Sequence, residues 1–229
     1  MKTVFDEGYF AMRTIWTRKE GEFVIKRNPN KEKAITVFNG TTRLHLMPSE
    51  AEFVLDEKDV CYVPVGEKVE IHEVERDSLV IVIEARSNLE TAPYCVEFGE
   101  VKGELRGELG YRRMVYTVLG EDKPAGRLIV GFTEGYNGEW TSYPPHKHDD
   151  MLEVYLFYGL GDYYGLQVVE SGNHVKALTV RDWDSVLIRR GYHPNVSVPK
   201  CGVKYMWALY PFKERKLRPE TDPRYSQSQ

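Results

Sequence analysis

Three histidines and one glutamate have the residue types and spacing to bind a metal ion. His146 and His148 are separated by one residue, Glu153 follows five positions later, and His193 lies far along the chain. In an extended segment alternate side chains share a face, which puts both imidazoles of the pair together and Lys147 on the opposite side. Three imidazoles and a carboxylate form a mixed nitrogen–oxygen set suited to Zn²⁺, Mn²⁺, Fe²⁺, Co²⁺ or Ni²⁺.

A His-x-His pair alone is more often just two polar surface residues. Glu153 and His193 favour the metal-site interpretation, because Glu153 can return on a neighbouring strand and His193 follows the strand predicted at 185–188. In an extended segment Lys147 and Asp149 alternate with the two histidines and point away from such an ion, so we do not expect either to be a catalytic base. The remaining histidines are interpreted as ordinary polar residues without a role: His45, His72 and His174.

Short β-strands must position these side chains, because helical periodicity is scarce. Segments rich in Val, Ile, Tyr, Phe and Thr recur between Gly, Asp, Asn and Pro, which is typical of a double-sheet sandwich or barrel. The Asn-Gly pairs at 39–40 and 137–138 have the chemistry of hairpin turns. The predicted strands span residues 34–38, 41–47, 59–63, 79–85, 112–119, 128–132, 154–157, 166–169, 177–180, 185–188 and 205–209.

The two halves of the chain resemble each other. Residues 56–71 and 181–196 each place an acidic turn before a strand and a glycine after it, and aligning Gly66 with Gly191 puts Lys68 opposite His193. The pattern indicates a duplicated β-barrel in which the second copy has a ligand that the first lacks. We therefore expect an N-terminal barrel without metal ligands over 1–90, a crossover segment over 91–110, a C-terminal metal-binding barrel over 111–213 and a polar tail over 214–229.

Composition restricts the class of partner. The formal net charge is −4 and the pI is near 5.9, which gives no basic patch for nucleic acid or an anionic membrane. No apolar run is long enough to span a bilayer, and charged residues near the N-terminus argue against a signal peptide. Three widely spaced cysteines without a CxxC motif favour a reducing, cytoplasmic location. The polar tail has no apolar periodicity, so we expect it to fray or to pack against a partner.

The motifs around the histidines resemble those of a known family. His-x-His, a glutamate and a distant Gly-x-His occur in this order in metal-binding cupins. The strings WTSYPPHKHD (140–149) and RRGYHPNV (189–196) are similar to those of the 5-deoxyglucuronate isomerase family of inositol catabolism, which is related to the 4-deoxy-5-keto-uronate isomerases. The chain departs from the family pattern by lacking an acidic insertion before Glu153 and by carrying Arg189 where proline is usual. The exact substrate therefore stays open.

The resemblance implies an all-β bicupin, with two jelly-roll-like barrels of the double-stranded β-helix type. It also implies a divalent metal held by His146, His148, Glu153 and His193, and places Gln167 at a glutamine position of these enzymes. The implied activity is a metal-dependent aldose–ketose isomerisation (an intramolecular oxidoreductase) of a deoxyuronate or related keto sugar acid. Besides Gln167, the residues expected to act on substrate are Tyr143, Arg190 and Tyr205, with Arg112 as an alternative carboxylate-binding cation.

Two other functions remain open from the sequence. A metal-dependent hydrolase on the same scaffold would open a cyclic diketo-inositol with a metal-activated water. A non-catalytic sugar-binding bicupin would use the metal to stabilise its barrel. In each case the partner is a small sugar acid or keto-inositol, and sheet edges allow a homo-oligomer without specifying one.

Overall fold

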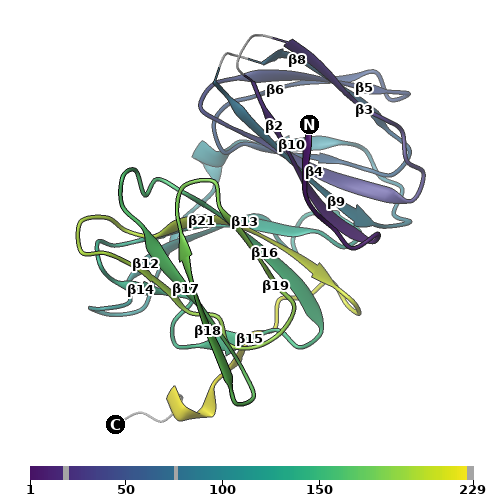
Figure 1. The fold of residues 1–229 in the computed structure, drawn as a ribbon. Helices are drawn as coiled ribbons and strands as arrows, with labels where there is room; N and C mark the ends of the chain where they lie inside the picture. Colours follow the sequence, from purple (N-terminus) through teal and green to yellow (C-terminus); the bar gives the residue numbers. More distant parts are fainter. Residues whose placement is uncertain (18–20, 75–76, 226–229) are drawn as a thin grey trace. The chain divides into compact units, whose positions relative to one another are not determined.

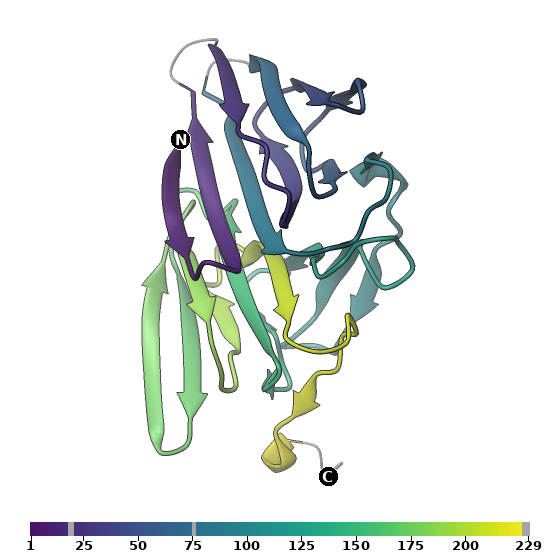
Figure 2. The same ribbon diagram turned by 90° about the vertical axis from the view of Figure 1, so that its right-hand side faces the viewer.

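A computed structural model describes residues 1–17, 21–74 and 77–225 of the chain (Figures 1 and 2). The chain divides into two compact units. The first unit contains Met1–Val101 and the segment Val118–Leu128, which we call the return segment, and the second contains Lys102–Thr117 and Ile129–Gln229. The sequence-based division assigned the return segment to the C-terminal barrel, whereas in the structure this segment is grouped with the first unit.

The first unit pairs a six-stranded sheet with a four-stranded sheet among the described residues. The larger sheet has the order β1 (Lys2–Asp6), β2 (Phe10–Trp16), β9 (Leu79–Arg86), β4 (Lys31–Phe38), β7 (Val60–Val63) and β10 (Tyr94–Val96). The smaller has the order β3 (Gly21–Ile25), β8 (Lys68–Val74), β5 (Thr42–Met47) and β6 (Ala51–Leu55).

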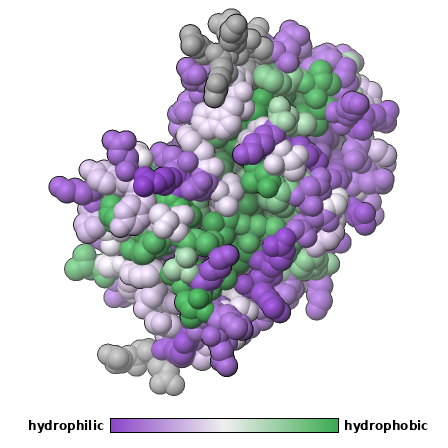
Figure 3. Space-filling model, viewed as in Figure 1, coloured by the Kyte–Doolittle hydropathy of each residue, from purple (hydrophilic) through white to green (hydrophobic). Residues whose placement is uncertain are grey.

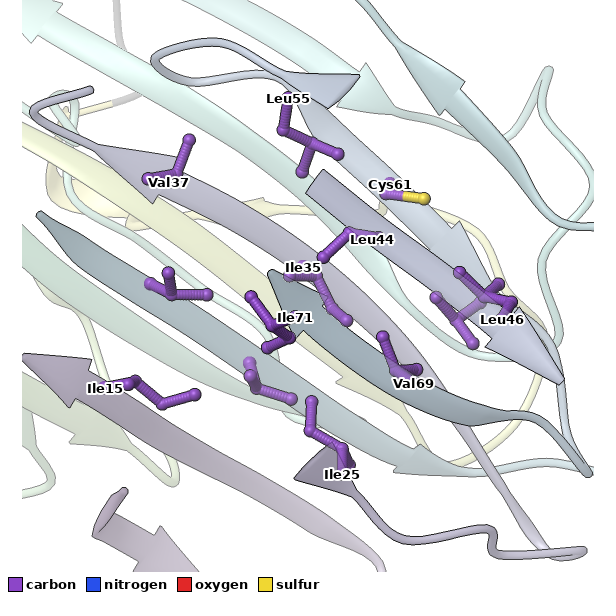
Figure 4. Packing of buried hydrophobic residues seen from close by; sticks show 13 residues of the cluster. Ile15, Ile25, Ile35, Val37, Leu44, Leu46, Leu55, Cys61, Val69 and Ile71 are labelled. Atoms are coloured by element: carbon purple, nitrogen blue, oxygen red, sulfur yellow. The ribbon is translucent and has the colours of Figure 1, made fainter. Parts of the chain in front are cut away.

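Alternation along the strands of the first unit produces its core. In β5, Leu44 and Leu46 are fully buried, while His45 between them is only partly covered. Leu44 of the smaller sheet belongs to the same apolar cluster as Ile35 of the larger sheet, so the core lies between the two sheets (Figure 4). Burying such side chains is the main favourable contribution to folding. Hydrophilic side chains predominate at the right-hand edge of the part of this unit seen in Figure 3, with hydrophobic ones among them toward its top.

The second unit repeats the arrangement, with an additional two-stranded sheet. Its larger sheet has the order β11 (Glu104–Arg106), β12 (Arg113–Leu119), β13 (Ile129–Gly135), β21 (Lys204–Pro211), β16 (Met151–Tyr158) and β19 (Ser185–Ile188). The smaller has the order β14 (Trp140–Thr141), β20 (Asn195–Ser197), β17 (Gly165–Ser171) and β18 (His174–Val180). The additional sheet pairs β15 (His146–Lys147) with β22 (Glu220–Thr221).

The all-β prediction is confirmed. Helix within the described residues is limited to two short 3₁₀ segments, η1 (Phe98–Glu100) and η2 (Pro223–Tyr225), and no helix there could cross a membrane. The β17–β18 hairpin is tight, with Ser171 paired to His174 across its turn (Figure 2). β16 lies between β21 and β19 and is buried along its whole length, so its side chains have fixed surroundings on both faces.

The buried carboxylate of Glu32 in β4 anchors the return segment to the first unit. It accepts hydrogen bonds from the backbone N–H groups of Gly126 (2.7 Å), Arg127 (2.6 Å) and Leu128 (2.8 Å). Tyr62 also donates its hydroxyl to this carboxylate, at 2.8 Å. Burial, followed by the charge of Glu32, raises the pKa of Tyr62, which keeps the phenol protonated as a donor. A buried charge is tolerated because each of its oxygens is hydrogen-bonded.

Glu32→Gln should lower the free energy of unfolding by about 3 kcal/mol, because an amide cannot accept from four donors and places an N–H group against some of them. Hydrogen exchange at the amides of residues 126–128 should accelerate at the same time. The measurements are denaturant unfolding and amide exchange, with exposed Glu57→Gln as the matched control. An unchanged unfolding midpoint with unchanged exchange would refute the anchoring role of Glu32.

Candidate metal centre and cavity

The second unit brings His146, His148, Glu153 and His193 together. His146 lies in β15 and His148 directly follows it, Glu153 lies in the buried strand β16, and His193 lies between β19 and β20. One ring nitrogen from each of the three histidines lies within 4.8 Å of the others. The sequence placed Glu153 on a strand neighbouring the histidine pair, whereas β15 pairs with β22 and β16 pairs with β19 and β21.

Glu153 is the acid that the imidazoles surround. Its Oε2 lies 3.0 Å from His193 Nε2 and 3.7 Å from His148 Nε2. The ring centroids of His146 and His193 are 4.7 Å apart. Glu153, His148 and His193 are at most 6% exposed, so little water reaches them. The two distances from Oε2 of Glu153 are those expected between atoms that bind one ion at bonds of about 2.0 to 2.2 Å.

The hydrogen bond that His193 donates from Nδ1 leaves its Nε2 facing a second acceptor, the carboxylate of Glu153. Nδ1 of His193 lies 2.9 Å from the carbonyl oxygen of Gly191, a bond that requires a proton on Nδ1. In the tautomer whose single proton is on Nδ1, Nε2 carries a lone pair, and it faces the carboxylate Oε2 of Glu153. Both of these buried atoms lack a hydrogen-bond partner among the described residues, as does Nδ1 of His148. Buried, unsatisfied acceptors at ligand spacing fit a divalent cation.

The surroundings favour neutral rings at His146 and His148. Burial, together with the neighbouring His193, lowers the pKa of His146 to about 3. Burial also lowers the pKa of His148. Neutral imidazole and ionised carboxylate are the forms that bind metal, so ligation at neutral pH needs little proton release from these side chains.

Gly191 has a backbone conformation that glycine favours, with φ of +98°, and a Cβ there would collide with the carbonyl oxygen of Glu170. The turn that presents His193 therefore requires glycine. Gly66, its counterpart in the first half, also has a positive φ of +83°. This shared conformation agrees with the predicted alignment of the two segments.

His146, His148 and Glu153 border a cavity of about 200 Å³, whereas His193 is not among its lining residues. Tyr155 and Tyr205 place their hydroxyls 2.8 and 3.0 Å from Oγ of Ser142, which forms a hydroxyl network in the wall. Burial, then the charge of Glu153, raises the pKa of Tyr155, so its hydroxyl stays protonated. The other lining residues are Arg106, Arg113, Val115, Thr117, Thr133, Pro144, Trp207, Leu209, Leu217, Pro219 and Thr221.

Arg113 is the half-buried cation of this cavity. It lies opposite Arg106 in the β11–β12 pair, and both side chains line the cavity wall. Arg106 is bonded to Glu104, whereas Arg113 donates to the carbonyl oxygen of Tyr111 at 3.1 Å and forms no ion pair with a carboxylate of the described residues. Burial lowers the pKa of Arg113. A guanidinium with this placement can bind an anionic ligand.

The C-terminal tail, which the sequence predicted to fray or to pack against a partner, forms part of the cavity from Leu217 to Thr221. β22 pairs with β15, Thr221 opposite His146, and the backbone N–H of Asp222 donates to the carbonyl oxygen of Pro145 at 2.8 Å (Figure 1). Leu217 packs against the apolar core of the second unit. Residues 226–229 of the predicted tail lie outside the described residues. The cavity wall thus depends on residues 217–222.

The residues predicted to act on substrate occupy different places. Tyr205 lines the cavity. Gln167 is fully buried and donates to the carbonyl oxygens of His193 (2.9 Å) and Pro194 (3.2 Å), so it is placed to position the His193 turn. Tyr143 packs its ring against Tyr111, Trp140 and Tyr225, and is not among the lining residues. Arg190 is exposed, and it too is outside the cavity lining.

Arg112, the alternative cation, is bonded to Glu139. Its Nε donates to Oε1 of Glu139 at 3.0 Å, and its backbone N–H donates to Oε2 at 2.7 Å. The hydrogen bonds from Arg112 lower the pKa of Glu139 to about 2. This pair ties the start of β12 to the segment that precedes β14.

The Glu139 pKa predicts a pH dependence of stability. The usual carboxyl pKa is near 4.5, so the unfolded chain binds more protons than the folded one between pH 4.5 and 2. The stabilisation is present above about pH 4.5 and is lost as pH falls toward 2. Glu139→Gln should lower stability at pH 7 and flatten its decline with acid, measured by urea unfolding at several pH values. An acid slope equal to that of exposed Glu108→Gln would contradict this prediction.

Comparison with known proteins identifies the family. The model of the KduI/IolB family matches residues 5–228. The chain is a member of the KduI/IolB family. This member is 26% identical to a 5-deoxy-glucuronate isomerase of Geobacillus thermodenitrificans (strain NG80-2) over 228 residues, which cover 91% of this chain and 83% of the relative. A 5-deoxy-glucuronate isomerase of Shouchella clausii (strain KSM-K16) is 32% identical over 162 residues, covering 64% and 59%.

Solved structures place the KduI/IolB member among the bicupins. An IolB-like protein from Salmonella typhimurium LT2 superimposes with a TM-score of 0.87 at 18% identity, covering 98% of this chain and 93% of that one. The oxalate decarboxylase of Lactobacillus farciminis, in its formate complex, superimposes with a TM-score of 0.70 at 9% identity, covering 93% and 79%. At these identities the likeness concerns the fold. The predicted double-stranded β-helix bicupin is confirmed.

Proposed function

We propose that this protein is a metal-dependent isomerase of a small sugar acid of the 5-deoxyglucuronate type, acting in inositol catabolism. The observation that carries the proposal is that His146, His148 and Glu153 border the same cavity as the Arg113 guanidinium, with His193 directly behind Glu153. The names of the relatives, 5-deoxy-glucuronate isomerase, supply the substrate class. Membership of the KduI/IolB family supports the same reaction class.

His146, His148, Glu153 and His193 are the residues that would hold the ion. A bound divalent cation supplies Lewis-acid polarisation of a substrate carbonyl and the adjacent hydroxyl. Zn²⁺, Mn²⁺, Fe²⁺, Co²⁺ and Ni²⁺ all accept such a donor set, and Gln167 keeps the His193 turn in place through the two carbonyl oxygens that it binds.

Arg113 binds the substrate carboxylate in this proposal. Its guanidinium is half-buried and has no carboxylate partner among the described residues, so an anionic ligand would complete its hydrogen bonding. The sugar chain then extends from Arg113 toward the imidazoles, past the wall that holds Tyr155, Ser142 and Tyr205. This orientation fixes which carbons of the substrate lie next to the cluster.

The hydroxyl network is the part of the wall that can exchange protons with substrate oxygens. Ser142 Oγ lies within hydrogen-bond distance of both phenols, and any of the three groups can donate or accept. An aldose–ketose isomerisation moves one proton between adjacent carbons and another between their oxygens. We assign the transfer between oxygens to Tyr205 and Ser142, with Tyr155 held protonated behind them.

The test follows the carbonyl by NMR in the purified full chain loaded with each divalent metal in turn. With 5-deoxyglucuronate in D₂O, we expect the carbonyl to move to the adjacent carbon. Ring opening of a cyclic diketo-inositol with incorporation of ¹⁸O from water would instead identify a hydrolase. Metal binding without turnover of either compound would identify a non-catalytic sugar-binding protein, and both of these results would overturn the proposal.

A further inference from the structure

A second group of side chains whose types can bind a metal ion lies on the first unit. β5 and β8 are antiparallel neighbours, and His45 lies directly opposite Glu70 in their register. His72 is two residues beyond Glu70 and shares its face of the sheet. The residues between them, such as Leu46 and Ile71, are buried in the core of this unit. The three polar side chains therefore project from the outward face of the smaller sheet.

One carboxylate oxygen is shared by both rings. Oε2 of Glu70 lies 3.6 Å from Nδ1 of His45 and 3.5 Å from Nε2 of His72. The three atoms that these residues can offer to an ion lie within 4.8 Å of one another. Two ligands of a tetrahedral ion with bonds of about 2.0 to 2.1 Å are about 3.4 Å apart. The Glu70 oxygen thus has ligand spacing to both imidazoles.

The opposite nitrogen of each ring is held by a further carboxylate. Nε2 of His45 lies 3.2 Å from Oε2 of Glu50, and Nδ1 of His72 lies 3.1 Å from Oε1 of Glu22. Histidines that ligate metals commonly donate their other N–H to a carboxylate, which fixes the tautomer and directs the second nitrogen's lone pair at the ion. Both histidines have this arrangement, and in each the nitrogen opposite the carboxylate is the one near Glu70.

Nearby charge and exposure are compatible with an ion. Lys68 binds the other oxygen of Glu70, with Nζ 2.6 Å from Oε1, and leaves Oε2 toward the rings. The side chains of His45, Glu70 and His72 are 25%, 24% and 27% exposed, so water can reach the group and complete a coordination shell. Two imidazoles with one carboxylate suit Zn²⁺, Co²⁺, Ni²⁺ or Cu²⁺ better than Mg²⁺ or Ca²⁺, which prefer oxygen ligands.

We propose that His45, Glu70 and His72 form a second transition-metal site, on the outward face of the first unit, with Glu50 and Glu22 orienting its histidines. A Zn²⁺ ion there ties β5 to β8. Local sequence patterns do not group these residues, because His45 and His72 are distant in the chain and neither belongs to a His-x-His pair. Their proximity follows from the register of the two strands.

The test is the zinc stoichiometry of the full chain. Protein stripped with a chelator is dialysed against Zn²⁺, and bound zinc is measured by mass spectrometry. The double variant His45→Gln/His72→Gln should bind one zinc fewer per chain than the wild type, whereas His174→Gln, a substitution of an exposed histidine outside both groups, should bind as many. Equal zinc in the double variant and the wild type would overturn the proposal.

Repeating the zinc measurement in a His146→Ala/His148→Ala background distinguishes zinc bound at this site from zinc bound in the cavity. There the zinc that remains should disappear on adding His45→Gln/His72→Gln, whether or not the cavity binds metal in the wild type. Glu50→Gln and Glu22→Gln should each weaken zinc binding by about 10- to 100-fold. Unchanged affinity in both single variants would show that the carboxylates do not orient the rings as proposed. Circular dichroism of the metal-free variants verifies folding.

Discussion

Glu153→Gln should abolish metal binding in the cavity without destabilising the metal-free protein. The charged ligand is replaced by a neutral amide of the same shape, so we expect metal affinity to fall more than about a hundredfold. Substituting a residue that only hydrogen-bonds to a ligand usually lowers metal affinity by about 10- to 100-fold. Loss of the ion should reduce kcat/KM by at least about a thousandfold, since Lewis-acid stabilisation contributes several kcal/mol. Metal content and turnover of 5-deoxyglucuronate measure the two effects.

The stability of the metal-free variant tests whether Glu153 and His193 form a metal site or a structural salt bridge. In the wild type, Oε2 of Glu153 faces the lone pair of His193 Nε2 at 3.0 Å, because the ring proton is held on Nδ1. The amide that Glu153→Gln introduces can donate a hydrogen bond to that nitrogen, so the metal-free variant should be as stable as metal-free wild type or more stable. If the pair were a structural salt bridge with a protonated ring, removing one partner would cost about 3 to 5 kcal/mol. Chemical denaturation after chelation distinguishes the two cases.

Arg113→Ala should raise KM for an acidic substrate by roughly 10- to 100-fold, because hydrogen bonds to charged groups contribute about 1.5 to 3 kcal/mol. Arg113→Lys should recover only part of this loss, since an ammonium group cannot bind both carboxylate oxygens in a fork. The measurement is steady-state kinetics with 5-deoxyglucuronate and with its primary amide. The amide lacks the charge, so the variant and the wild type should differ little with it.

Arg190→Ala tests which arginine binds the substrate carboxylate. The structure favours Arg113, whereas the sequence predicted Arg190. If Arg190 binds the carboxylate, its removal should raise KM as strongly as the removal of Arg113. The exposed position of Arg190, outside the cavity lining, leads us to expect the larger effect at Arg113. A KM that responds to Arg190→Ala and not to Arg113→Ala would reverse this assignment.

Strand parity explains why Arg113 was missed. Arg113, Val115 and Thr117 alternate along β12 and all line the cavity, whereas Arg112 lies one position earlier and pairs with Glu139. The alternation was present in the sequence, but deciding which face is inward requires the position of the neighbouring strands. Register across a sheet depends on residues far apart in the chain, which local patterns do not contain.

The proximity of the three histidines and Glu153 was predictable because their spacing reflects backbone geometry. His146 and His148 are two positions apart, so their side chains share a face of an extended segment. The Gly-x-His turn was visible from the resemblance between the two halves of the chain. The roles of Gln167 and of the tail were not predictable. Gln167 faces backbone carbonyls that only the folded turn presents, and the tail joins the cavity through backbone pairing of β22 with β15, which leaves no side-chain signature.

The return segment limits how this chain can be dissected. Because the polypeptide passes from the first unit to the second, back again and then once more to the second, no single cut yields both units whole. A fragment that ends at Val101 would leave the Glu32 carboxylate buried without its three backbone donors, and a fragment that begins at Lys102 would carry those donors with nothing to bind. Swapping barrels between bicupins by joining them at one point would fail for the same reason. A successful chimera must transfer residues 118–128 together with the first barrel.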